Sequence, residues 1–284
     1  MDWAAHVDTA VFGAVLCAAA GLLVPRIIER VPEPEPEEPD DAVERGGSGL
    51  SSESGEPGDT HASDAVQPAA DRDTDRAQPR FEGGVQEEEV PKETYFAIAD
   101  RPGLLWKSVL AAALAGAGIG LALGWDWALL VWLPLVPLGV ALAVIDWRTR
   151  LLPTWLVTRT YVVVVLLVLV ATLITRDWQD LVRAAIGWAA AGLLYFVLWF
   201  LYPRGLGYGD VRLSGIVGIA LGYVGTAELV VGVYAGFLVG GLLGAVLAML
   251  KIVDRKGVPF GPFMLVGAVI GLLASAWITA LASG

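Results

Sequence analysis

Residues 127–145 read WALLVWLPLVPLGVALAVI, a run without one charged side chain. About 18 or more apolar residues allow an α-helix to cross a bilayer, so this run predicts a transmembrane helix. An earlier run covers Ala10–Val24, and further runs occupy residues 104–124, 153–174, 181–202, 211–225, 226–250 and 262–282. The sequence therefore predicts an all-α, polytopic membrane bundle of about eight transmembrane helices.

The composition supports a membrane protein. Hydrophobic residues make up 56% of the 284 residues, and a soluble protein would need a very large core to bury so many. The formal net charge of −11 arises mainly from one acidic segment. We therefore expect the lipid bilayer as the surroundings of the chain and no nucleic acid as a partner.

The chain divides into three regions. Residues 1–25 hold the first apolar run and, before it, no Lys or Arg, which favours a retained span over a cleaved signal peptide, with a short anchor as the alternative. Residues 26–103 begin near the repeat PEPEPEEP and are rich in Pro, Gly, Ser and acid, so we expect a disordered linker. Residues 104–284 form the predicted membrane domain.

Positive residues predict the orientation of the spans, because Lys and Arg collect on the cytoplasmic side. If the N-terminus lies outside, only Arg176 and Arg183 fall on the outer side. The inner side then receives Arg26, Arg30, Arg101, Lys107, Arg148, Arg150, Arg159, Arg204, Arg212, Lys251, Arg255 and Lys256. This asymmetry predicts a multi-pass membrane protein with a cytoplasmic linker.

Several kinds of catalytic site are excluded by residue content. Cys17 is the single cysteine, and His6 and His61 both lie outside the main apolar block. A Ser–His protease needs an imidazole among the helices, and a membrane metalloprotease needs paired histidines. We therefore expect no metal and no cofactor, and carboxylates are the groups left to do chemistry.

Asp146 is the first candidate, because the apolar run ends directly on it and the next helix starts at Pro153. A charge near bilayer depth is costly, so such residues are usually functional or paired. The structural alternative is an interfacial carboxylate satisfied by Arg148 or Arg150. Asp254 lies among cations and is interpreted as a solvated loop residue.

Asp210 is the second candidate and follows the glycine-rich stretch Gly205-Leu206-Gly207-Tyr208-Gly209. Glycines permit close backbone approach. A phosphate-binding loop is a poor match, because no Gly-Lys-Ser/Thr follows and no βαβ pattern surrounds it. The remaining structural alternative is an N-cap aspartate of the next helix.

Together, Asp146 and Asp210 suggest one chemistry. Both fall on the predicted inner face, whereas Asp126, Asp177, Asp180 and Glu228 fall on the outer one. Two neighbouring carboxylates do not both ionise easily, so one keeps its proton. The ionised group then activates water while the protonated group polarises a scissile carbonyl.

At this point the sequence resembles the prepilin peptidase family, membrane aspartyl proteases with a Gly-x-Gly-Asp signature. Asp146 followed by Leu152-Pro153 is similar to the first family motif, and Gly207-Tyr208-Gly209-Asp210-Val211-Arg212 is similar to the second. The third motif is matched by Pro259-Phe260-Gly261-Pro262-Phe263. The three motifs occur in the family's order within residues 104–284.

The resemblance implies an aspartic endopeptidase of a bacterial plasma membrane, with Asp146 and Asp210 as the catalytic pair. Its substrates would be prepilin-like or pseudopilin-like membrane proteins that lose a short leader at the cytoplasmic face, and pilus or secretion assembly machinery is a possible partner. Family members often also methylate the new N-terminus. The 26–103 segment has no CxxC pairs, so we expect that activity to be missing.

Two departures from the family pattern are Thr154, where an acidic or amide residue often follows Leu-Pro, and Arg212, where Lys is usual. Three alternatives remain open on sequence alone. One is a related aspartyl protease with other membrane substrates, another is an inactive assembly partner, and the third is a transporter. Transporters usually hold such charges near mid-membrane on broken helices, whereas these two sit at span ends.

Overall fold

The structure, a computed structural model, describes residues 6–33, 93–203, 206–250 and 259–282. Asp254 and most of the predicted linker lie outside the described residues. Ten helices and no strand are found in the described ranges. The helices are α1 (Val7–Gly21), α2 (Val24–Glu29), α3 (Tyr95–Ala99), α4 (Leu104–Leu123), α5 (Ala128–Thr149), α6 (Thr154–Thr175), α7 (Trp178–Leu201), α8 (Tyr208–Val224), α9 (Thr226–Met249) and α10 (Gly261–Ala282).

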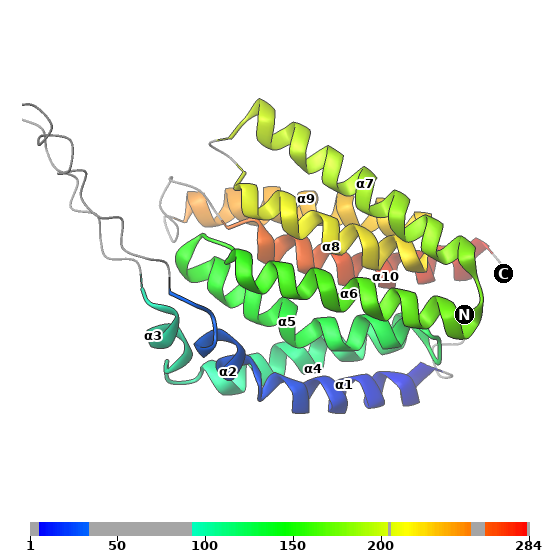
Figure 1. Cartoon of the computed structure of the whole chain (residues 1–284), viewed down its shortest axis with the longest axis horizontal. Coiled ribbons are helices and arrows are strands. Elements are labelled where there is room, and N and C mark those ends of the chain that lie inside the picture. The colour runs from blue at the N-terminus through cyan, green and yellow to red at the C-terminus, as the bar shows by residue number, and fades with distance from the viewer. Residues whose placement is uncertain (1–5, 34–92, 204–205, 251–258, 283–284) are drawn as a thin grey trace, which may run out of the picture. The chain divides into compact units, whose positions relative to one another are not determined.

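The long helices pack side by side, and three pairs share the most extensive contacts: α1 with α4, α7 with α8, and α9 with α10. In Figure 1 α1 and α4 lie along one edge, with α5 and α6 beside them. Helix α10 contacts α4, α5, α8 and α9 and so joins the first part of the bundle to the last. The all-α architecture expected from the apolar runs is confirmed.

In the part of the chain that the structure describes, four helices, α4 to α7, are long and apolar enough to cross a membrane. Three shorter apolar helical stretches lie at Val7–Gly21, Thr226–Leu242 and Gly261–Ser275 among the described residues. The many large hydrophobic side chains on the outside, such as Leu114, Val162 and Leu193, suit a lipid environment. A membrane protein is therefore supported, while the count of about eight spans stays a prediction.

Glycines bring the backbones of the paired helices into direct contact. A Cβ on Gly187 of α7 would collide with the carbonyl oxygen of Gly218 on α8, and the reverse also holds. Gly267 of α10 meets the backbone of Gly236 on α9 in the same way. Small residues at helix interfaces allow this packing in membranes. Gly124 follows α4 as its C-cap residue, with φ 61°.

The ends of α5 and α8 place the two candidate aspartates. Helix α5 continues beyond Asp146 to Thr149 and stops at Arg150, which has a left-handed backbone and donates its N–H to the Asp146 carbonyl oxygen at 2.8 Å. Helix α8 starts at Tyr208, earlier than the apolar run near residue 211 suggests. Asp210 therefore lies within the first turn of α8.

Candidate active site

Asp146 is buried although it lies in the last turns of α5, with 4% of its surface exposed. Its Oδ2 accepts a hydrogen bond from the backbone N–H of Gly261, at the start of α10, at 3.0 Å. Neither Arg148 nor Arg150 forms an ion pair with Asp146 in the described part of the chain. The structural alternative of an arginine-satisfied surface carboxylate is therefore wrong.

Asp210 is also buried, with 7% of its surface exposed. Gly207 is the N-cap residue of α8, and its N–H donates to Asp210 Oδ2 at 3.1 Å. Asp210 is thus the third helical residue and not the N-cap, which corrects the structural alternative for this position. The other oxygen, Oδ1, is buried and has no hydrogen-bond partner among the described residues.

The two carboxylates come from different helices and interact electrostatically with each other. They share a further arrangement, because each has its Oδ2 bound by the backbone N–H of a motif glycine. Gly261 is packed closely: a Cβ there would lie 2.7 Å from Asp146 Oδ2 and 3.4 Å from Leu213 Cδ2 on α8. The Pro259–Phe263 motif thus contacts both aspartate-bearing helices.

Contacts between the first two motifs connect the start of α6 to the start of α8. A Cβ on Gly209 would lie 2.9 Å from Cβ of Leu152, so the side chain of the Leu-Pro pair rests on this glycine. Arg212 Nη1 donates to Thr154 Oγ1 at 2.7 Å. The two positions that depart from the family pattern are therefore hydrogen-bonded to each other, which gives a physical reason for their joint presence.

The rest of the third motif supports this arrangement. Pro259 is buried just before α10, and Pro262 is half-buried in its first turn. Phe263 packs edge-on against Trp147, the residue after Asp146, with ring centroids 6.3 Å apart. Pro153 precedes α6 as its N-cap in an extended conformation. Gly207 and Gly261 thus contact an aspartate, Leu152 contacts Gly209 in the first turn of α8, and Phe260 packs against Tyr195.

Tyr195 of α7 is a neighbour that the motifs do not contain. It is 1% exposed, and its hydroxyl has no hydrogen-bond partner among the described residues. The charge of Asp210 acts on this phenol. Its ring lies 5.0 Å from that of Phe237 and 5.9 Å from that of Phe260, between centroids. An aromatic residue within an apolar span carries no signal of such a place in the sequence.

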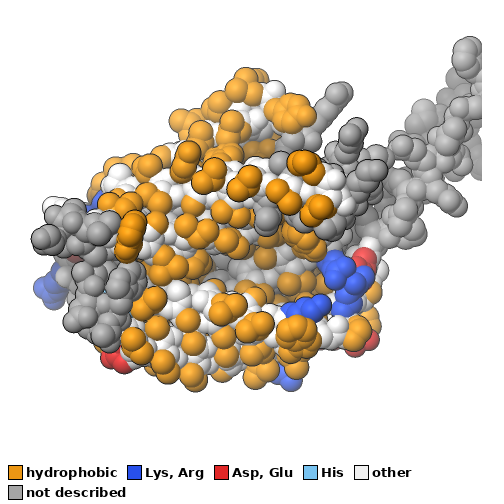
Figure 2. All heavy atoms as spheres, turned by 180° about the vertical axis from the view of Figure 1, so that it is seen from behind, with side chains coloured by type: hydrophobic (Ala, Val, Ile, Leu, Met, Phe, Trp, Pro, Cys, Tyr) orange, Lys and Arg blue, Asp and Glu red, His pale blue; other side chains and the backbone are white. Residues whose placement is uncertain are grey.

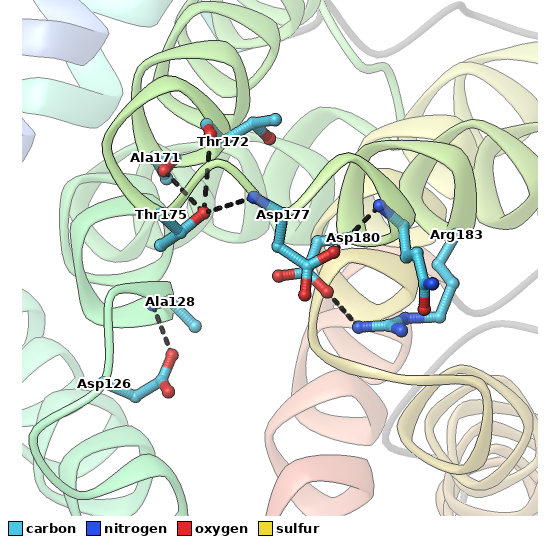
Figure 3. A network of polar contacts seen from close by, with 9 residues as sticks. Asp126, Ala128, Ala171, Thr172, Thr175, Asp177, Asp180 and Arg183 are labelled. Carbon is cyan, nitrogen blue, oxygen red and sulfur yellow. Dashed lines mark hydrogen bonds and ion pairs between the residues drawn. The ribbon is translucent and has the colours of Figure 1, made fainter.

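The acidic residues of the α4–α5 and α6–α7 connections have structural partners (Figure 3). Asp126 Oδ1 accepts the N–H of Ala128 at 2.7 Å at the start of α5. Asp177 is the N-cap of α7 and accepts the N–H of Gln179 at 2.9 Å. Asp180 forms an ion pair with Arg183. Helix capping and pairing account for these three carboxylates, whereas Asp210 has a helix-start contact through Oδ2 only and a buried Oδ1 without a partner among the described residues.

Comparison with protein families finds a match over residues 133–249, to the type IV leader peptidase family. This part of the chain is similar to that family. The matched range contains both aspartates and the first two motifs, while Pro259–Phe263 lies beyond it. Comparison with curated proteins and with solved structures found no significant match.

The similarity to a leader peptidase family supports a hydrolase of the protease class, and the apolar helices support a membrane protein. The buried carboxylates, their glycine donors and the aromatic cluster around Tyr195 are the described groups at the shared end of α5, α8 and α10.

Proposed function

We propose that this protein is an aspartic endopeptidase that removes leader peptides from prepilin-like membrane proteins, with Asp146 and Asp210 as its catalytic pair. The observation that carries the proposal is the burial of two interacting carboxylates from separate helices, each bound through Oδ2 by a motif glycine. Burial of two such groups near each other is expensive, and ionisable residues at bilayer depth usually serve a function.

The arrangement suits activation of water without a metal. One carboxylate, ionised, takes a proton from water as the oxygen attacks the scissile carbonyl carbon, and the protonated partner donates to the carbonyl oxygen. The tetrahedral intermediate then collapses and the C–N bond breaks. The carboxyl group that took the proton from water gives it to the leaving amine, and the other carboxylate regains its proton from the hydroxyl of the intermediate as the new carboxyl group forms. The glycine N–H donors keep each Oδ2 in place, which leaves the Oδ1 atoms to face the reacting groups.

We further propose that cleavage takes place at the cytoplasmic face. The motivation is the bias of Lys and Arg toward the end of the bundle that holds Asp146 and Asp210. A substrate helix spanning the same bilayer would present its leader at that membrane surface. The linker region and a possible methyl transfer stay predictions from the sequence.

The experiment is cleavage of a prepilin-like substrate by the full chain reconstituted in lipid vesicles, with product mass identifying the cleaved bond. We expect cleavage at the leader junction and no cleavage of an unrelated single-span protein of equal length. Processing of both substrates at equal rates would favour the broader membrane protease, and processing of neither would contradict the proposal.

Chelation tests the metal-free mechanism separately. Because the proposed chemistry needs only two carboxylates and water, addition of EDTA should leave the cleavage rate unchanged within about twofold. A metal-dependent peptidase treated in parallel serves as the control. Loss of activity with EDTA and its recovery on adding a divalent cation would contradict the mechanism.

A further inference from the structure

A deep apolar groove opens on the side of the bundle. Its volume is about 950 Å³, and residues of α4, α5, α8 and α10 line it. Leu114, Val136, Ile216 and Val266 are among the apolar side chains of its walls. Leu114 is 65% exposed and Val266 is 49% exposed, so the groove opens sideways, toward lipid in a membrane. Figure 2 shows a hollow in this hydrophobic face.

Cations gather at one end of the groove. Arg101, Lys107 and Arg148 line it there, and Figure 2 shows Lys and Arg side chains beside the hollow. Arg101 is paired with Glu93 at 2.6 Å. No carboxylate in the described part of the chain forms an ion pair with Lys107 or Arg148, and both are exposed. Two positive charges, those of Lys107 and Arg148, are therefore available at this end of the groove, which we call its mouth.

A buried hydroxyl lies next to this mouth. Ser108 follows Lys107 on α4, belongs to the groove lining and is 2% exposed. Its Oγ has no hydrogen-bond partner among the described residues. Buried hydroxyls usually have partners. The groove therefore has two cations, Lys107 and Arg148, at one end. The hydroxyl of Ser108 lies next to them, and the apolar wall follows.

We propose that the groove binds one anionic phospholipid. Lys107 and Arg148 hold its phosphate, Ser108 lies at the depth of the ester carbonyls, and an acyl chain follows the wall between α4 and α10. Basic pockets between transmembrane helices select anionic head groups by this charge complementarity. The site is distinct from the proposed catalytic pair, because neither Asp146 nor Asp210 lines the groove.

The distribution of charge favours a lipid over a substrate helix as the occupant. The cations Lys107 and Arg148 lie at the end of the spans, where lipid phosphates begin, and the rest of the groove lining is mostly apolar.

The test is retention of lipid by the full chain, measured by native mass spectrometry after extraction from vesicles of equal phosphatidylcholine and phosphatidylglycerol. We expect one phosphatidylglycerol to be retained in preference to phosphatidylcholine. The double variant Lys107→Gln with Arg148→Gln should weaken that preference about thirtyfold, the effect of two cations near a membrane surface. Millimolar inorganic phosphate should not displace the lipid.

A matched control removes two other cations, Arg26 and Arg159, which are exposed and do not line the groove. The variant Arg26→Gln with Arg159→Gln should retain phosphatidylglycerol like the wild type. Ala111→Phe, which fills the groove below the mouth, should abolish retention of the lipid.

Equal retention of the two lipids by the wild type, or equal losses in the control, would overturn the proposal. Displacement of the lipid by a prepilin-like helix in direct competition would also overturn it, since it would assign the groove to the substrate. Lipid retention is read without any cleavage assay, so the outcome is independent of the proposed peptidase activity.

Discussion

At the residue scale, the site depends on glycines as much as on aspartates. Gly207 and Gly261 supply the N–H donors to the two Oδ2 atoms, and Gly209 makes room for Leu152. Gly-x-Gly-Asp is a weak pattern in sequence because each glycine has several possible uses. The contacts give Gly207, Gly209 and Gly261 one structural role each. None of these three glycines has a positive φ.

Gly261→Ala is expected to lower the cleavage rate at least about a hundredfold, because its Cβ would lie 2.7 Å from Asp146 Oδ2 and displace the carboxylate. The control is Gly139→Ala on α5, where a Cβ would meet the methyl groups of Leu265 at an ordinary 3.6 Å. Initial rates of leader cleavage measure both variants. Wild-type activity in Gly261→Ala would contradict the assigned contact.

Tyr195→Phe tests the buried phenol on which the charge of Asp210 acts. We interpret Tyr195 as a positioning residue, since its buried hydroxyl and Asp210 Oδ1 both have no partner among the described residues. Phenylalanine keeps the ring contacts with Phe237 and Phe260. We expect kcat to fall about tenfold with KM and thermal stability unchanged. Tyr202→Phe, at an exposed position after α7, is the control, and an unchanged kcat in Tyr195→Phe would refute this role.

At the element scale, glycine contacts between paired helices set the distance between the helices that carry the residues of the proposed site. Helix α7 carries Tyr195 and α8 carries Asp210, and the two meet at Gly187 and Gly218. The apolar runs predicted the long helices well, because hydrophobic length is visible in one sequence. The start of α8 was less predictable, since Gly207 caps it three residues before Asp210 and lies in no apolar run.

Gly187→Ala should destabilise the protein, because the added Cβ collides with the Gly218 carbonyl oxygen and forces α7 away from α8. We expect the apparent Tm in detergent to fall by roughly 5 °C or more. Gly192→Ala on the same helix, where a Cβ would meet nothing within 4 Å, should leave Tm unchanged or raise it slightly. Equal Tm values for the two variants would argue against the close contact.

At the scale of the whole molecule, the fold gathers three separate motifs at one end of the bundle. The sequence alone was enough to predict the motifs and their position at the ends of apolar runs. The contacts between residues on different helices could be found only in the structure. Tyr195 illustrates the limit, because an aromatic residue within a span has no distinguishing pattern around it. The hydrogen bond between Thr154 and Arg212 is a second example, since the residues are far apart in the chain and both depart from the usual pattern.

The most direct measurement of the central claim is the leader-cleavage rate of Asp146→Asn and of Asp210→Asn in reconstituted vesicles. Asparagine keeps the size of the side chain but cannot exchange a proton, so each variant should lose at least about a thousandfold in rate. Asp126→Asn, in which asparagine also caps α5, should cleave like the wild type. Retention of more than a tenth of the wild-type rate by either Asp146→Asn or Asp210→Asn would contradict the account.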